Sequence, residues 1–446
     1  SDMMEWLVFL IMIGVFLLLT FKKVPIGLAL AASAIVAMPV SGMGFSLAKI
    51  FEGAFGYFDA IMVIASAMIF MNSINESGML ENLANAIVRR FYNRPLFLMV
   101  LMTLFIMSAG MITGSSIAAV LTTGAIASPV LLKMGLSKNR AMGIVAMSSV
   151  FGMIAPPVNI PVMIIGQGVD MPYMGFTTPL LWITIPLALF TTLFLCRKEL
   201  KPIQKKDVVF VKASFWVYTP LVVLILLLVL ESARVIPSLG MPLIFMISSL
   251  FSLVGAKKYN YFKMSVKAIS SGLSIMSILI GVGMFIQVMT MTGVRGFIVS
   301  SLINLPNYML YFTVGLGVPL FGAVSCYGSA SVLGVPFLLA FIGGNDIIIA
   351  ACISMLAALG DMMPPNSLAA NFSAGLIGEK KYFGIVKQSV VPILVTIVYS
   401  VSIIIFSRSL KGVMNNILIF SVTAGITLLI IYLLDVLRYR RGDKNA

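Results

Sequence analysis

The sequence contains no histidine, and only 10% of its 446 residues are charged. The absence of histidine excludes Ser-His-Asp triads, histidine metal ligands and histidine proton relays. A soluble domain has roughly 25% charged residues, so the low share here excludes soluble enzymes and nucleic-acid-binding proteins. The three cysteines, Cys196, Cys326 and Cys352, lie in or beside apolar segments without metal-ligand spacing. We interpret them as small buried hydrophobic residues.

Hydrophobic residues make up 60% of the chain, and the mean hydropathy is +1.09. Apolar runs of about 20 residues, the length that crosses a bilayer, recur from end to end. The sequence therefore predicts an all-α polytopic membrane protein with about 11 transmembrane helices. The predicted spans are 5–20, 24–40, 59–78, 141–166, 177–196, 213–231, 237–254, 269–291, 346–377, 384–406 and 414–436.

The net charge of +15 is distributed unevenly over the loops between these spans. If the N-terminus is outside, 25 of the 30 basic residues lie on one side, including the 197–212 cluster and the tail with Arg438, Arg440, Arg441 and Lys444. Cytoplasmic loops are enriched in Lys and Arg, so the C-terminal tail is predicted to be cytoplasmic. The basic excess thus reports orientation in the cell (inner) membrane and says little about the substrate.

Two further apolar stretches, 96–132 and 308–342, have both of their ends on the same predicted side. Each stretch has a Gly-Ser break near its middle, TGSSIAA at 113–119 and YGSASVL at 327–333. We interpret them as re-entrant helical hairpins, the first entering from the cytoplasm and the second from outside. Irregular backbone at membrane depth is tolerated where it is buried in protein or lines a polar cavity.

The two halves of the chain share a pattern of three spans, a hairpin, a broken span and a last span. Three features recur at offsets of 215, 214 and 208, namely Gly78 with Gly293, Gly114 with Gly328, and Pro156-Pro157 with Pro364-Pro365. The halves begin on opposite sides, which predicts inverted repeats at 1–200 and 201–410, with an additional helix and basic tail at 411–446. Inverted repeats with interrupted helices are typical of secondary transporters, which bind substrate and ion near the midplane.

The Pro pairs lie inside the apolar runs 141–166 and 346–377, which are therefore expected to be broken helices. Proline lacks an N–H and displaces the carbonyl of residue i−4, so free carbonyl oxygens that suit Na⁺ are expected there. Glycines and serines of the hairpin tips would complete such a site, and helix N-termini would suit a carboxylate. For one Pro pair alone, a packing bend is the competing interpretation.

Asp361 is the one acidic residue that we place well inside a span. A carboxylate at that depth is costly and usually functional, so we expect it to coordinate or balance a cation. A structural ion pair is the alternative. The amides of Asn159 and Asn366, which follow the Pro pairs, either line the cavity or cap a helix.

Residues 110–166 and 321–375 resemble the large membrane subunit of TRAP transporters, within the ion-transporter superfamily. The resemblance lies in the small-residue tip, the hydrophobic run to Pro, the short basic turn and the Pro-Pro element. It implies a Na⁺-driven, elevator-type importer of organic acids such as C4-dicarboxylates or sialic acids. It also implies two partners, a small four-helix membrane subunit that is not fused to this chain and an extracytoplasmic binding protein.

The resemblance also implies which residues form the site. The substrate-binding residues would be Ser115, Ser116, Asn159, Ser329, Ser331 and Asn366. The sodium ligands would be Gly114, Ser115, Pro156, Pro157, Gly328, Ser329, Asp361, Pro364 and Pro365. Sodium is the coupling ion, and no other cofactor is expected. In the elevator hypothesis the hairpins and broken helices move against a scaffold of the remaining spans, with stretches near 78–92 and 293–304 as connecting arms.

Two departures from the family pattern are visible. Val158 follows the first Pro pair, where the family usually has serine, and Ala118-Ala119 stand where an acidic residue is frequent. The alternative function is a stand-alone sodium- or proton-coupled carboxylate permease of the same superfamily. A membrane enzyme or a channel is a third interpretation, but no histidine, acidic cluster or metal-spaced motif favours an enzyme, and no ring-forming filter favours a channel.

Overall fold

The computed structural model describes residues 2–198 and 200–442, which form helices joined by turns and loops, with no strand in these ranges. The predicted all-α class is confirmed. The predicted basic tail extends to Lys444, which lies outside the described residues. The helices of the first predicted repeat are α1 (Asp2–Phe21), α2 (Ile26–Val40), α3 (Leu47–Ala54), α4 (Phe58–Glu76), α5 (Met79–Phe91), α6 (Pro95–Thr113), α7 (Ser116–Ala119), α8 (Ala125–Lys133), α9 (Lys138–Ile154), α10 (Ile160–Gly168) and α11 (Thr177–Leu195).

The rest of the chain repeats this order of long helices, short helices and breaks. Its helices are α12 (Thr219–Ser232), α13 (Met241–Leu250), α14 (Tyr261–Met291), α15 (Val294–Ile303), α16 (Asn307–Gly322), α17 (Cys326–Ser329), α18 (Val335–Ala340), α19 (Asp346–Ala358), α20 (Leu368–Leu376), α21 (Phe383–Gln388), α22 (Val390–Ile405), α23 (Ser407–Met414) and α24 (Ile417–Gly442). π-Helical turns join α7 to α8 and α17 to α18, at Val120–Gly124 and Ala330–Gly334.

Within the described residues, eight helices are long and apolar enough to cross a membrane, or nine if the bent pair α22–α23 is one span. Both arms of the first hairpin, Pro95–Thr113 and Ser116–Lys133, are among them, whereas α2, α13 and α15 are shorter. Numerous membrane-compatible helices thus agree with the predicted class. The count of about 11 spans and the re-entrant nature of the hairpins stay predictions.

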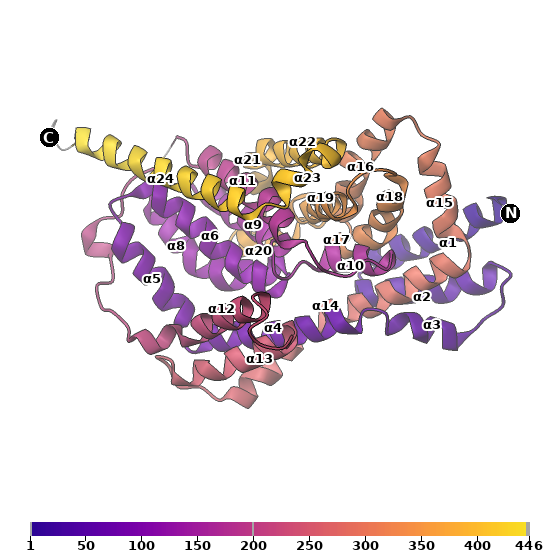
Figure 1. Cartoon of the computed structure of the whole chain (residues 1–446), viewed down its shortest axis with the longest axis horizontal. Coiled ribbons are helices and arrows are strands. Elements are labelled where there is room, and N and C mark those ends of the chain that lie inside the picture. Colours follow the sequence, from indigo (N-terminus) through magenta and orange to yellow (C-terminus); the bar gives the residue numbers. More distant parts are fainter. Residues whose placement is uncertain (1, 199, 443–446) are drawn as a thin grey trace.

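One group of helices is organised around the 31-residue helix α14, which packs against α2, α3 and α4, while α13 packs on α4. Glycines allow these close crossings: a Cβ on Gly27 would collide with Ser277 O, and a Cβ on Gly283 would collide with Gly53 O. We call α1–α4 and α12–α14 the scaffold body. It fills the lower part of Figure 1 and continues to the N-terminal end.

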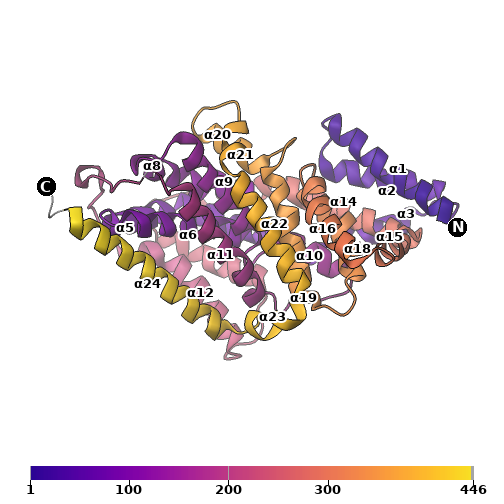
Figure 2. The same ribbon diagram turned by 90° about the horizontal axis from the view of Figure 1, so that it is seen from above.

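The second group contains both hairpins and both broken helices. Helix α9 packs against α6, α7, α11 and α20, and α19 packs against α10, α16 and α22. We call α6–α11 and α16–α22 the hairpin body. The helices α5 and α15 lie between the two bodies, α5 against α4 and α6 and α15 against α14 and α18. Helix α24 runs along the outside of α6 and α11, and the two termini lie at opposite ends of the molecule (Figures 1 and 2).

The two halves share several local geometries. Gly78 and Gly293, which begin the arms α5 and α15, are both left-handed, with φ of 82° and 78°. In each half the first hairpin helix crosses the broken helix at a glycine contact, Gly110 with Gly152 and Gly322 with Gly360. The duplication itself stays a prediction. The boundaries at 200 and 410 and the inversion across the membrane stay predictions.

The second hairpin turns earlier than expected. Helix α16 ends at Gly322 and α17 begins at Cys326, so Ala323–Ser325 form the tip, and Gly328 lies inside α17. The predicted match of Gly114 with Gly328 is therefore wrong. Ser115 instead corresponds to Ser325, because each is an extended N-cap whose side chain accepts from the amide three residues later, Ala118 and Gly328. The chain makes this second turn without glycine, which the Gly-Ser pattern did not indicate.

Candidate functional site

Four interrupted segments meet in the hairpin body. We call Gly114–Ser116 tip 1, Ala323–Cys326 tip 2, Ala155–Asn159 break 1 and Met363–Ser367 break 2. Helix α7, which starts at tip 1, packs against α20 beyond break 2, and α17, which starts at tip 2, packs against α10 beyond break 1. Each tip is therefore close to the helix that follows the break of the other half, in addition to the break of its own half.

Asp361 connects tip 1 to the segment that leads into break 2. It lies in a short 3-10 helical turn (Leu359–Met362), is 5% exposed, and accepts a hydrogen bond of 2.6 Å from Ser116 Oγ. Among the ion pairs of the described chain none includes Asp361. The alternative of a structural ion pair is thus not supported, and the carboxylate has a neutral partner only.

The two tips also contact each other. The Tyr327 hydroxyl, on α17, donates to the carbonyl of Gly114 at 3.2 Å. Asn366 Nδ2 donates to the carbonyl of Val324 at 2.7 Å, which links break 2 to tip 2. Together with the Ser116–Asp361 bond, these two bonds connect the two hairpin tips with break 2 and the turn that precedes it. Movement of one hairpin tip would therefore disturb hydrogen bonds that hold the other tip.

Break 1 is buried and is closed by the side chain of Asn159. Its Oδ1 accepts from Val162 N at 2.9 Å, and its Nδ2 donates to Ile154 O at 2.8 Å and Ser354 Oγ at 3.0 Å. Asn159 thus caps α10 and bridges the break. Of the two interpretations of this amide, a cavity-lining group or a helix cap, the structure shows the helix cap. At break 2 the N-cap of α20 is Ser367, so Asn366 is not the cap.

The carbonyls of the second prolines have protein donors. Tyr173 donates to Pro157 O at 2.8 Å, and Tyr382 donates to Pro365 O at 2.9 Å. The expectation of free carbonyls at the breaks is therefore wrong for these two oxygens. Sequence reasoning did not single out either tyrosine, although they follow their prolines by 16 and 17 residues and so form a repeated signal. The Pro156–Pro157 and Pro364–Pro365 peptide bonds are cis.

The remaining predicted residues lie at or near the tips. Ser329 and Ser331 are fully buried in the second hairpin, where they donate to Val318 O at 2.7 Å and Gly328 O at 2.9 Å. They lie beyond tip 2, whereas Ser325, which the sequence reasoning missed, is at the tip itself. Tip 1 is as expected: Gly114 is left-handed with φ of 64°, and Ser115 and Ser116 follow it.

The breaks differ in their surroundings. Pro156 is buried, but Pro364 and Pro365 are exposed, so the second break opens to one face of the hairpin body. The tips and breaks contain no lysine or arginine. Among the described residues no group of three or more acidic, cysteine or histidine side chains is arranged to hold a metal ion. The site therefore consists of hydroxyls, backbone groups, the side-chain amides of Asn159 and Asn366, and one carboxylate.

Comparison with solved structures places this architecture among membrane transporters. The YdaH transporter of Alcanivorax borkumensis has a TM-score of 0.56 and 14% identity, over 79% of this chain and 86% of that one. MtrF of Neisseria gonorrhoeae, described as illuminating a class of antimetabolite efflux pumps, has a TM-score of 0.52 and 10% identity, over 80% of this chain and 82% of that one. At such identities the likeness concerns the fold alone.

No curated protein sequence matches the chain. The family model described as "Tripartite ATP-independent periplasmic transporter, DctM component" matches residues 8–410, a range that includes both hairpins and both breaks. The match also agrees with the many apolar helices of a multi-pass membrane protein. The chain therefore belongs to the DctM component family, the large permeases of TRAP transporters, which are secondary transporters.

Proposed function

We propose that this permease takes up an organic acid anion, such as a C4-dicarboxylate or a sialic acid, together with Na⁺. The observation that carries the proposal is Asp361, a buried carboxylate whose hydrogen-bond partner is the neutral hydroxyl of Ser116. An unpaired charge at this depth is costly, so a cation that neutralises it is strongly favoured. Ser116, Gly114 O and the backbone of tip 1 offer oxygen ligands beside it.

The anion would bind to backbone amides and hydroxyls. Helix α20 begins at break 2 without a side-chain cap, so its first turn offers free N–H groups and the positive end of the dipole. Helix α10 offers fewer donors, because Pro161 has no N–H and Val162 N already donates to Asn159 Oδ1. Such a site binds a carboxylate without a basic side chain. Sodium at Asp361 would also reduce repulsion between this carboxylate and the anion, which couples the two ligands.

The division into two bodies supports an elevator movement. Both hairpins and both broken helices pack in one body, while α14 and its partners form the other, with α5 and α15 between them. In this mechanism the hairpin body carries its ligands past the scaffold, and the sodium gradient drives the anion inward. A small four-helix subunit and an extracytoplasmic binding protein would complete the system, in the cell (inner) membrane.

The decisive experiment is thermal unfolding of the purified chain in NaCl, compared with KCl and choline chloride at equal ionic strength. Binding to the native state at about ten times the dissociation constant contributes roughly 1.4 kcal/mol per site, which raises the melting temperature. We expect a saturable, Na⁺-specific rise in the parent chain. Asp361→Asn should lose most of this rise.

The matched control is Asp59→Asn, because Asp59 is an exposed carboxylate on the scaffold helix α4. It should keep the full sodium response. A parent chain that melts equally in all three salts would overturn sodium coupling and favour a proton-coupled permease. Uptake by the chain alone in proteoliposomes, without any partner protein, would favour the stand-alone carboxylate permease.

A further inference from the structure

A contact between the two bodies is formed at the end of α10. Tyr57 directly precedes the scaffold helix α4, is 4% exposed, and donates its hydroxyl to Ile164 O at 2.8 Å. Its ring lies against α14, because a Cβ on Gly283 would be 3.4 Å from Tyr57 Cδ2. The donor therefore belongs to the scaffold body, while its acceptor belongs to a broken helix of the hairpin body.

A second donor approaches the same helix end. Arg295, the second residue of arm α15, donates through Nη1 to Gly168 O at 2.6 Å. Gly168 is the last residue of α10. Carbonyls in the last turn of a helix lack partners within the helix, and the negative end of the dipole favours a cation there. Arg295 is therefore a charged C-cap supplied by another part of the molecule.

We propose that Tyr57 and Arg295 are a latch that holds the hairpin body in the position seen here. The inference rests on the proposed elevator movement. Sliding of α10 along α4 breaks the Tyr57 bond, and Arg295, only four residues after the end of the scaffold helix α14, must release Gly168 when α10 moves away from that end. A cavity of about 350 Å³ adjoins Tyr57 and is lined by Asp59 from α4 and Gln167 from α10. Water in this cavity can form a hydrogen bond with the released Tyr57 hydroxyl, which makes breakage of that bond reversible.

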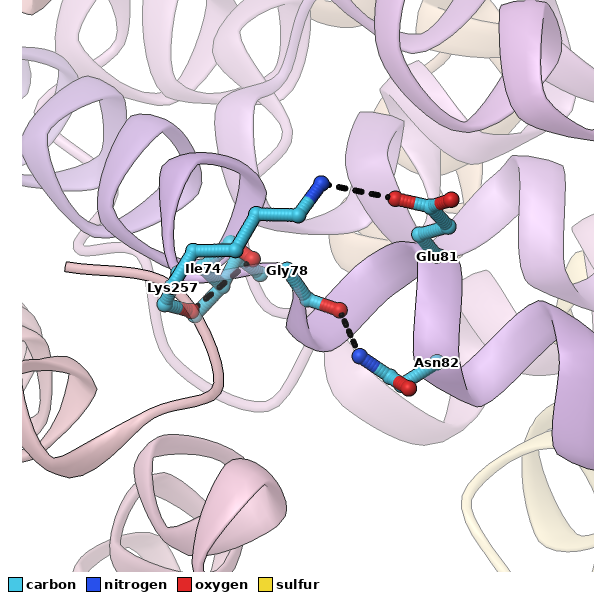
Figure 3. Close-up of polar contacts among 6 residues, drawn as sticks. Ile74, Gly78, Glu81, Asn82 and Lys257 are labelled. Carbon is cyan, nitrogen blue, oxygen red and sulfur yellow. Dashed lines mark hydrogen bonds and ion pairs between the residues drawn. The ribbon is translucent and has the colours of Figure 1, made fainter. Parts of the chain in front are cut away.

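The other arm, α5, is held by a contact with the scaffold, so the proposed latch is confined to the end of α10. Lys257, in the loop before α14, forms an ion pair of 3.0 Å with Glu81 on α5 (Figure 3). Its backbone N–H donates to Ser77 O at 3.1 Å. Lys257 and Ser77 both belong to the scaffold side. The Lys257–Glu81 pair thus joins α5 to the scaffold, whereas Arg295 joins α15 to the hairpin body. Release at α10 is then the step that frees the hairpin body.

The latch is testable by the distance between spin labels on the two bodies, in the full-length chain without added substrate. Suitable label sites are Phe262→Cys on α14 and Met174→Cys after α10, whose parent side chains are 82% and 71% exposed. The native cysteines Cys196, Cys326 and Cys352 are buried, so background labelling is low.

We expect one dominant distance in the labelled parent and a second population in Tyr57→Phe and Arg295→Gln. A charged donor contributes more than a neutral one, so Arg295→Gln should change the population ratio by roughly tenfold or more and Tyr57→Phe by less. Arg295→Lys, which retains the cation at the helix end, should restore part of the parent distribution.

The matched control is Tyr399→Phe, which removes a hydroxyl that donates to Trp182 O at 2.5 Å within the hairpin body. It should show the parent distribution. Unchanged distances in both latch variants, or an equal change in Tyr399→Phe, would overturn the latch. Because this measurement needs neither Na⁺ nor an anion, loss of the sodium-specific melting response alone would count against the proposed function and not against the latch.

Discussion

Asp435 is a buried acid outside the candidate site. It lies on α24, is 1% exposed, and its two carboxylate oxygens accept from Leu96 N at 3.2 Å and Phe97 N at 2.7 Å. These amides are in the first turn of α6, where backbone donors have no partner within the helix. Asp435 therefore caps the N-terminus of α6 from a distant part of the same chain. Its negative charge also interacts favourably with the positive end of the α6 dipole.

Removal of this cap should destabilise the start of the first hairpin. Asp435→Ala is expected to lower the free energy of unfolding by about 1–2 kcal/mol, as for the loss of a helix N-cap. Asp435→Asn keeps one acceptor oxygen and should lose less. Thermal unfolding in detergent measures both, with Ser421→Ala on the exposed part of α24 as control. Equal melting temperatures in all three variants would contradict the capping role.

At the residue scale, the sequence indicated which side chains belong to the candidate site better than it indicated their hydrogen-bond partners. Asp361 could be singled out because it is a carboxylate in an apolar run, a property of the local sequence. Its bond to Ser116 joins residues 245 positions apart, and no local pattern specifies such a pair. Tyr173 and Tyr382 do carry a local signal, because each follows its proline by 16 or 17 residues, but the signal appears only when the two halves are compared.

At the scale of elements, close helix crossings at glycine define the hairpin body. A Cβ on Gly360 would overlap the backbone of Gly322, and a Cβ on Gly152 would be 2.5 Å from Met107 O. Both contacts join the first helix of a hairpin to a broken helix. Neither crossing can accept a methyl group unless the two helices separate.

Gly360→Ala should therefore be strongly destabilising. Overlap with backbone cannot be relieved by a rotamer change, so we expect a loss of several kcal/mol, about the size of severe overpacking, or failure to fold. Gly375→Ala on α20 is the matched control, because a Cβ there meets nothing within 4 Å. Folded yield and melting temperature in detergent compare the two. Similar values would show that the crossing is looser than described.

The arm α5 begins at a left-handed glycine. Gly78 has φ of 82°, and its carbonyl accepts from Asn82 Nδ2 at 2.7 Å, next to the Lys257–Glu81 pair (Figure 3). Left-handed backbone costs roughly 1–2 kcal/mol for a residue with a side chain. Gly78→Ala should lower the melting temperature accordingly, while Gly317→Ala, a helical position with open space, should not. No difference between the variants would show that the arm adapts freely.

The type and order of the helices and breaks could be predicted from the sequence, but the residue at which the second hairpin turns could not. Apolar length and the Pro pairs located the helices and breaks, because those signals are local. The tip of the second hairpin was displaced, since Gly328 resembles Gly114 in sequence while Ala323–Ser325 make the turn. A small-residue run permits a turn at several positions, so the local sequence does not specify which position is used.

At the scale of the whole molecule, the arrangement into two bodies depends on contacts that the sequence does not show. The Lys and Arg distribution predicts orientation, and the repeated motifs predict a duplication. Which helices pack together is decided by crossings such as Gly27 with Ser277 and Gly53 with Gly283. Those glycines are not distinguishable in sequence from others in the chain.

The proposed movement predicts that a covalent link between the bodies stops transport. Ala60 on α4 and Met163 on α10 line the same cavity, so a cysteine pair at these positions can be joined by a bifunctional thiol reagent. The link would fix α10 to the scaffold, and Na⁺-dependent uptake of an organic acid into proteoliposomes should fall to background. Cleavage of a reducible reagent should restore it.

The control link joins two helices of the hairpin body. The hydroxyls of Thr103 on α6 and Thr192 on α11 are 2.6 Å apart and both side chains are buried, so cysteines there would be joined directly as a disulfide by a mild oxidant and not through a reagent. These helices move together in an elevator, and this link should leave uptake nearly unchanged. If the Ala60–Met163 link left uptake intact, α10 would not slide along α4, because a fixed pair cannot separate. Equal inhibition by both links would instead indicate movements within the hairpin body, such as opening of a tip.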